Sequence, residues 1–97
     1  SQRPVIVTEN GVATDNDSER QDYIRRAITS LERAVADGID IRGYYHWSFL
    51  DSFEWAAGYR PLMGLISVDP KTKKRTPKPS AFLLRNLCPK KSMIWQL

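Results

Sequence analysis

The chain has 97 residues, a net charge of +4, a hydrophobic content of 41% and a charged content of 27%. This composition is typical of one globular domain and excludes disordered and membrane-spanning classes, since no apolar run approaches the ~20 residues of a transmembrane helix. The single cysteine, Cys88, excludes an internal disulfide, and with one histidine, His46, it gives no basis for a metal or cofactor site. The absence of an apolar signal peptide at the start favours a cytoplasmic location.

The charge is uneven along the chain. Residues 1–60 hold seven Lys/Arg and ten Asp/Glu, whereas residues 61–97 hold eight Lys/Arg and one acid. A basic run is compatible with a nucleic-acid patch, but no aromatic residues are interleaved with it as a single-strand binding surface requires. We therefore expect no nucleic-acid partner, and we expect no membrane partner either. The basic run is expected to be a solvated loop leading into a helix; it consists of Lys71, Lys73, Lys74, Arg75 and Lys78.

The first half of the chain predicts a strand, a loop and a helix. Pro4–Thr8 is short and β-branched, which indicates a buried strand, and Asn10–Asp17 is polar. The helix is predicted to begin at Ser18 as N-cap, with Gln21 as its capping-box partner, and to end before Gly38. Its apolar stripe consists of Ile24, Ile28, Leu31 and Val35.

The second half predicts a strand over Ile39–Trp47, a long structured loop over Asp51–Met63, a short strand over Leu65–Val68 and a helix over Pro77–Leu87. The tail 89–97 is irregular. Strand, helix and strand with short links favour a right-handed βαβ unit, so the fold class is α/β. Two such units do not close a sheet, because the edges of a parallel pair need neighbours. We expect a piece of a larger barrel or doubly wound sheet, completed by a missing segment, another chain or a second copy.

The first predicted strand leads into Thr8-Glu9-Asn10-Gly11. Catalytic residues of α/β proteins collect where a parallel strand ends and its loop begins. A carboxylate held there can act as a base or as a covalent nucleophile. The alternative is a solvated surface charge beside a common Asn-Gly turn.

A second candidate site follows Trp47, where a carboxylate, Glu54, stands among the aromatic residues Phe49, Phe53, Trp55 and Tyr59. Aromatic rings stack on the C–H face of a sugar while a carboxylate accepts hydrogen bonds from its hydroxyls. The alternative is a hydrophobic core, for which Trp47 is best suited because it lies on a strand. Burying Glu54 unpaired is costly, so it reaches solvent or has a partner.

These stretches resemble glycoside hydrolase family 1, the retaining β-glucosidase and β-galactosidase family. Residues 7–11 (VTENG) are similar to its nucleophile motif, and residues 43–55 (GYYHWSFLDSFEW) to its second signature, followed by Gly58-Tyr59. Further matches to the closing segment of the family are Gly64-Leu65, Val68-Asp69, Arg75, Pro77-Lys78 and Ser80. The resemblance covers roughly residues 4–85.

The resemblance implies a (β/α)8 TIM barrel, with residues 1–97 as its last quarter: the seventh strand and helix and the eighth strand and helix. It implies that Glu9 is the nucleophile and that Trp47 is the platform under the sugar next to the cleaved bond. It also implies that Glu54 binds the 4- and 6-hydroxyls of the glycone and that Trp55 binds near its 3-hydroxyl. The phospho-glycosidases of the family usually carry a Ser and a Lys at the positions of Glu54 and Trp55, so Glu54 favours a non-phosphorylated glycone.

One catalytic group is absent from the sequence. A retaining glycosidase needs two carboxyl groups about 5–5.5 Å apart, and the family's acid/base lies in an Asn-Glu-Pro motif that does not occur here. We therefore expect a β-glycosidase active only with the rest of its barrel. The alternative is an inactive glycan-binding or scaffold fragment that uses Trp47 and Glu54, but a pure binder has no chemical need for Glu9.

Overall fold

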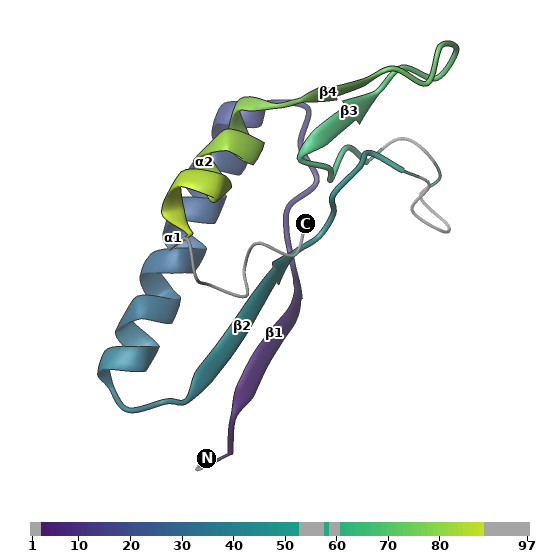
Figure 1. The fold of residues 1–97 in the computed structure, drawn as a ribbon. Coiled ribbons are helices and arrows are strands. Elements are labelled where there is room, and N and C mark those ends of the chain that lie inside the picture. Colours follow the sequence, from purple (N-terminus) through teal and green to yellow (C-terminus); the bar gives the residue numbers. More distant parts are fainter. Residues whose placement is uncertain (1–2, 53–57, 59–60, 89–97) are drawn as a thin grey trace.

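Two parallel strands form the centre of the computed structural model, which describes residues 3–52, 58 and 61–88 (Figure 1). Strands β1 (Val5–Asn10) and β2 (Ile41–His46) pair in parallel and are joined by helix α1 (Asp17–Ala36). This confirms the predicted strand–helix–strand unit. Because the strands are parallel, their carboxyl ends lie at the same end of the sheet.

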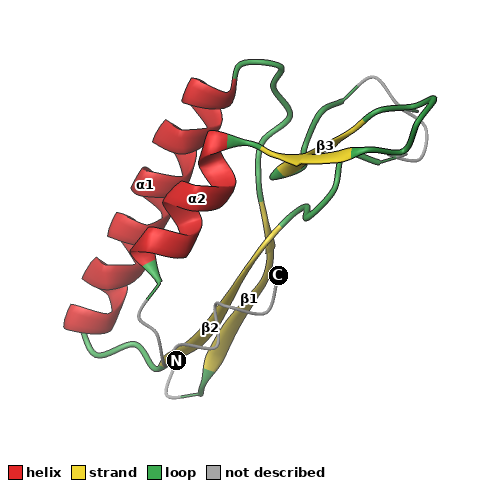
Figure 2. Cartoon of the chain, turned by 45° about the horizontal axis from the view of Figure 1, so that its top comes forward, coloured by secondary structure: helices red, strands yellow, loops and turns green. Residues whose placement is uncertain are grey.

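Beyond β2 the chain forms an antiparallel hairpin and a second helix. Strands β3 (Ile66–Val68) and β4 (Arg75–Pro77) pair with each other, and α2 (Pro79–Leu87) follows. The two helices lie side by side on one face of the parallel pair, and the hairpin projects beyond its carboxyl end (Figure 2). Neither of the described helices is long and apolar enough to cross a membrane. The predicted tail 89–97 lies outside the described residues.

The prediction for residues 71–78 was wrong in part. Arg75–Pro77 is a strand rather than a loop or the first turn of a helix, because it pairs with the short strand before it. The lysines at the hairpin tip are exposed as expected. Lys78 is not solvated: its ammonium lies 3.0 Å from Asp51 Oδ1, and 15% of its side chain is exposed.

The N-cap of helix α1 lies two residues before the predicted one. Asn16 is the N-cap, and its Oδ1 accepts hydrogen bonds from the backbone N of Ser18 at 3.1 Å and from the Ser18 hydroxyl at 2.6 Å. Asn and Ser are both good N-cap residues, so the predicted residue type was suitable but its position was wrong. The end is as predicted, with Asp37 as C-cap and Gly38 at φ +91°, a left-handed conformation that suits glycine.

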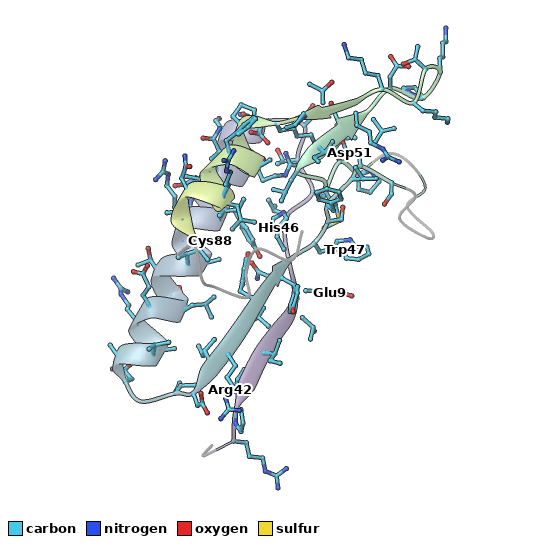
Figure 3. All side chains as sticks on the ribbon, in the orientation of Figure 1. Glu9, Arg42, His46, Trp47, Asp51 and Cys88 are labelled. Carbon is cyan, nitrogen blue, oxygen red and sulfur yellow. The ribbon has the colours of Figure 1, made fainter. Side chains whose placement is uncertain are left out.

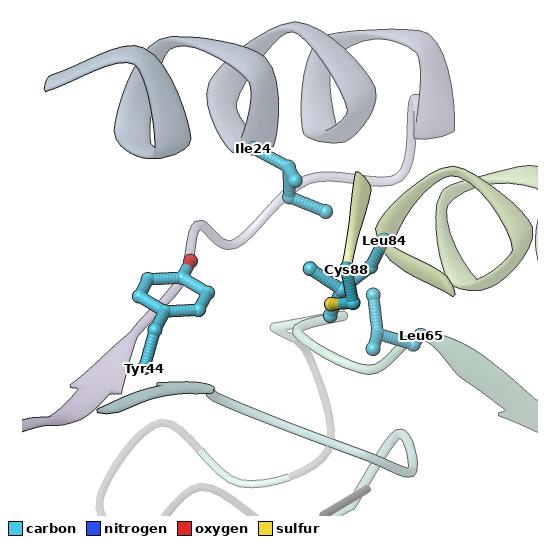
Figure 4. Close-up of a cluster of buried hydrophobic side chains, with 5 residues drawn as sticks. All are labelled: Ile24, Tyr44, Leu65, Leu84 and Cys88. Carbon is cyan, nitrogen blue, oxygen red and sulfur yellow. The ribbon is translucent and has the colours of Figure 1, made fainter. Parts of the chain in front are cut away.

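The core lies between the helices and the helix-facing side of β2 (Figure 4). It contains Ile24 from α1, Tyr44 from β2, Leu65, and Leu84 and Cys88 at α2. Cys88 packs there with its free thiol buried. Val35 is 54% exposed, which contradicts its place in the predicted apolar stripe. The reason is length, since the nine residues of α2 cannot cover all twenty of α1.

A buried arginine, which no local sequence pattern predicts, joins three segments. Arg20 is 1% exposed and donates to Asp17 Oδ1 at 2.9 Å, to the Thr14 carbonyl at 2.7 Å and to the Leu62 carbonyl. A buried charge is costly unless it is paired and hydrogen-bonded. Arg20 therefore fixes the loop before α1 against the loop that precedes β3.

Candidate active site

Glu9 lies near the carboxyl end of β1, where its side chain is exposed. Figure 3 shows it pointing away from the two helices, on the open side of the parallel pair. No hydrogen bond or ion pair joins its carboxylate to another residue in the described part of the chain. Exposure and lack of a local partner are the properties expected of a group that meets a substrate or another segment of a protein.

Asn10 ties the end of β1 to β2. Its carbonyl accepts a hydrogen bond from the Trp47 backbone N at 2.9 Å, and its Oδ1 accepts one from the Tyr44 hydroxyl at 2.9 Å. Burial raises the pKa of Tyr44 to about 12, with smaller contributions from Tyr23 and Cys88. The Tyr44 phenol is therefore a neutral donor at any physiological pH.

Gly11 permits a close approach of the two strand ends. A Cβ at this position would overlap the carbonyl oxygen of Trp47, which is backbone and cannot rotate away. Only glycine fits between the segments. The Asn-Gly pair is thus part of the junction between β1 and β2, in addition to being a turn signal.

Trp47 follows β2 directly and is 40% exposed. The interpretation of Trp47 as a core residue is therefore wrong, since in this strand the helix-facing residues are Tyr44 and His46. Glu9 and Trp47 point to the same open side, away from α1 and α2 (Figure 3). The peptide bond between Trp47 and Ser48 is cis.

The segment after Trp47 is held by a second segment of backbone. Ser48 N donates to the Met63 carbonyl, Leu65 N donates to the Ser48 carbonyl, and Asp51 N donates to the Ile66 carbonyl, each at 3.0 Å. The Asp51 carboxylate accepts from Gly64 N at 2.8 Å. These bonds fix both ends of the loop predicted over residues 51–63. The predicted sugar ligands Glu54 and Trp55 lie outside the described residues.

His46 is a buried histidine on the helix-facing side of β2. Burial lowers its pKa to about 4, the charge of Arg20 acts in the same direction, and the Met63 carbonyl opposes both. Neither ring nitrogen has a hydrogen-bond partner of good geometry in the described part of the chain. His46 is therefore neutral at pH 7. Among the described residues, no group of three His, Cys, Asp or Glu side chains is placed to hold a metal ion.

Comparison with known protein families decides the family of this chain. The model of glycosyl hydrolase family 1 matches residues 1–93. The chain belongs to this family. It is 42% identical over 84 residues to a β-galactosidase of Sulfolobus acidocaldarius, a match that covers 87% of this chain and 17% of that protein.

Solved structures of family 1 glycosyl hydrolases agree with the sequence match. The apo structure of a β-glucosidase is 49% identical with a TM-score of 0.84, covering 93% of this chain and 23% of that one. A family 1 β-glucosidase from Thermotoga maritima, also solved with glucoimidazole, is 38% identical with a TM-score of 0.83. This match covers 86% of this chain and 21% of that one. The chain is thus a piece of the TIM-barrel fold of these enzymes, and it spans about a fifth of their length.

Proposed function

We propose that this chain supplies the nucleophile and part of the sugar site of a retaining β-glycosidase. The observation that carries the proposal is the junction at the carboxyl ends of β1 and β2, where Glu9 and Trp47 face the same open side. In TIM-barrel enzymes this end of the strands bears the active site. Membership of glycosyl hydrolase family 1 supports the reaction class.

The reaction proceeds in two displacements. The Glu9 carboxylate attacks the anomeric carbon of a terminal β-linked sugar, and the leaving-group oxygen departs with a proton from an acid residue. The resulting glycosyl-enzyme ester is then hydrolysed by a water molecule whose proton returns to the same residue, now acting as a base. The sugar leaves with its original configuration, and Glu9 is regenerated.

Sugar recognition is assigned to Trp47, Glu54 and Trp55. The partly exposed Trp47 ring offers an apolar platform to the C–H face of the sugar. Glu54 binds the 4- and 6-hydroxyls of the glycone and Trp55 binds near its 3-hydroxyl, an assignment that rests on the family signature in residues 43–55. The substrate class is a non-phosphorylated β-glycoside such as a glucoside or galactoside.

The acid/base residue comes from outside this chain. We assign residues 1–97 to the last quarter of the barrel, with β1 and β2 as its seventh and eighth strands. Support comes from the length, about a fifth of the relatives, and from a parallel pair that needs neighbours at its edges. The partner is the remaining barrel segment, and a second copy of this chain is the less favoured alternative.

The proposal is tested in a hybrid barrel, in which the whole 97-residue chain replaces the matching segment of the Thermotoga maritima β-glucosidase. We expect hydrolysis of an aryl β-glucoside, and its loss by at least about 10⁴-fold in Glu9→Ala. Azide restores turnover of this variant and yields the α-glycosyl azide, because only one displacement remains. Glu32→Ala, which removes an exposed carboxylate from α1, is the control and leaves turnover unchanged.

Two results would overturn the proposal. Turnover of Glu9→Ala equal to that of the unchanged hybrid would show that Glu9 is not the nucleophile. A folded hybrid that binds glucoimidazole but turns over no substrate, with Glu9 intact, would favour the glycan-binding alternative.

A further inference from the structure

The pairing of β1 with β2 is irregular at Glu9. Val7 pairs with Tyr44, and Asn10 pairs with His46, so β1 uses one residue more than β2 between these two pairs. The extra length falls on Thr8 and Glu9. A bulge of this kind re-aims the side chain that it contains and breaks the ladder locally, so the direction of Glu9 depends on what holds the strand beyond it.

Asn10 is the residue that restores the pairing. Its carbonyl accepts from the Trp47 backbone at 2.9 Å, and its side-chain oxygen accepts from the Tyr44 hydroxyl at 2.9 Å. The first bond fixes the main chain, and the second fixes the side chain on the helix-facing side. Tyr44 is 2% exposed and packed in the core, so its hydroxyl is a stationary anchor.

We infer that Asn10 and Tyr44 are a positioning pair for Glu9, which holds the bulge so that the carboxylate faces the sugar on the Trp47 platform. The inference rests on the proposed function of Glu9. Neither residue of the pair touches the sugar in this arrangement, because both side chains meet on the side of the sheet opposite to Glu9. They act through the backbone of a neighbouring residue.

The expected cost of losing the pair follows from the geometry of the attack. Displacement at the anomeric carbon needs the nucleophile at about 3–3.5 Å and in line with the leaving group, and a 1 Å misplacement costs about 10²-fold. The loss falls on the chemical step. Sugar binding at Trp47 is preserved, because the platform does not depend on the Tyr44 hydroxyl.

The test uses the hybrid barrel and an activated aryl 2-deoxy-2-fluoro-β-glucoside. Glu9 displaces the phenolate from this probe, and the resulting ester hydrolyses slowly, so the rate of labelling is read by mass spectrometry. Tyr44→Phe removes one hydroxyl and keeps the ring in the core. We expect labelling of Glu9 to slow by about 10- to 100-fold, with KM for an ordinary substrate unchanged within about twofold.

Tyr23→Phe is the matched control. Tyr23 lies on α1 close to Tyr44, and its hydroxyl has no hydrogen bond in the described part of the chain. We expect its labelling rate to equal that of the unchanged hybrid. Equal slowing in both variants would overturn the inference, because a general loosening of the helix–sheet interface would then explain the effect.

A double-mutant cycle isolates the hydrogen bond. Asn10→Ala removes the acceptor and leaves the Tyr44 hydroxyl in place, so it also serves if Tyr44→Phe does not fold. We expect the double variant to be no slower than the slower single variant, since both remove one shared interaction. Additive losses of labelling rate in the double variant, or unchanged labelling in both single variants, would overturn the positioning role of the pair and leave the proposed function intact. Absence of Glu9 labelling in the unchanged, folded hybrid would instead overturn the proposed function.

Discussion

The carboxylate of Asp17 caps α2 from a position 63 residues earlier in the sequence. Its Oδ2 accepts from the Ser80 backbone N at 2.8 Å, and its Oδ1 accepts from the Ser80 hydroxyl at 2.7 Å. Lys78, the N-cap of α2, makes no side-chain capping bond, so Asp17 supplies the missing acceptor. Burial acts to raise the pKa of Asp17, but the hydrogen bonds from Ser80 and Arg20 outweigh it and lower the pKa.

Removing this cap is expected to destabilise the packing of the two helices. Asp17→Ala takes an acceptor from Ser80 and leaves Arg20 buried without its carboxylate, which costs about 3 kcal/mol. We expect a fall of several degrees in the unfolding temperature of the hybrid barrel and faster hydrogen exchange at the start of α2. Asp22→Ala breaks an exposed ion pair with Arg26 and is the control, with little change expected. Equal effects of the two substitutions would contradict the capping role.

The buried His46 predicts acid sensitivity above pH 4. Its pKa is about 4 in the folded chain and 6.5 in an unfolded one, so the unfolded state binds more protons between these values. The free energy of unfolding therefore falls as the pH drops from 6.5 to 4, by about 3 kcal/mol in total. His46→Leu keeps the site apolar and removes this slope. Denaturant unfolding of both hybrids at pH 7, 5.5 and 4 measures it, and parallel pH curves would contradict the prediction.

Substitution by alanine is expected to affect activity at Gly11 and stability at Gly38. Gly11→Ala drives a Cβ into the Trp47 carbonyl, so it separates the strand ends and lowers kcat/KM by about 10²-fold. Gly38→Ala meets no atom within 4 Å but strains a left-handed residue, so it costs about 1 kcal/mol of stability and leaves kcat/KM unchanged. Steady-state kinetics and thermal unfolding of the two hybrids compare them directly. Normal kinetics in Gly11→Ala would show that the close approach is not needed.

The partly exposed Trp47 predicts a loss of sugar affinity when the ring is removed. Trp47→Ala takes away the apolar platform, and we expect the Kd for glucoimidazole to rise by about tenfold or more, which corresponds to about 1.4 kcal/mol. Trp47→Phe retains a smaller ring, and we expect its Kd to lie between those of Trp47→Ala and the unchanged hybrid. Phe82→Ala on α2 also removes an exposed aromatic ring and is the control, with no change in Kd. Isothermal titration of the folded hybrids measures these values.

The βαβ unit was predictable because its signals are local. Apolar spacing in residues 18–37 and a glycine stop define α1, a short β-branched run defines β1, and an alternating pattern over residues 39–47 defines β2. The start of α1 was missed by two residues, because Asn16, Asp17 and Ser18 are all good capping residues. The choice among them depends on Asp17 bonding to Ser80 and Arg20, which no local pattern reveals.

The location of Glu9 and Trp47 at the strand ends was predictable, whereas the contacts that support this region were not. Motif resemblance pointed to Glu9 and Trp47, and both lie at the open carboxyl end of the parallel pair. The Tyr44–Asn10 bond depends on which side of β2 faces the helices, and aromatic residues on both sides of that strand make this side hard to predict. The burial of Arg20 depends on its bond to the Leu62 carbonyl, 42 residues away in the sequence. Strand β4 was missed because its three exposed residues carry no apolar signal and pair only through the folded hairpin.

The β3–β4 hairpin gives this chain a region that can change length without disturbing the parallel strands. Its strands form a separate sheet, and among the described residues it is fastened at its base by the Leu50–Ile66 bridge and the Lys78 N bond to the Leu65 carbonyl. The tip around Lys73 is exposed. Exposed loop tips tolerate insertions, so a peptide tag or a recognition module inserted here would project beyond the carboxyl end of the parallel pair while the strands that carry Glu9 and Trp47 keep their pairing.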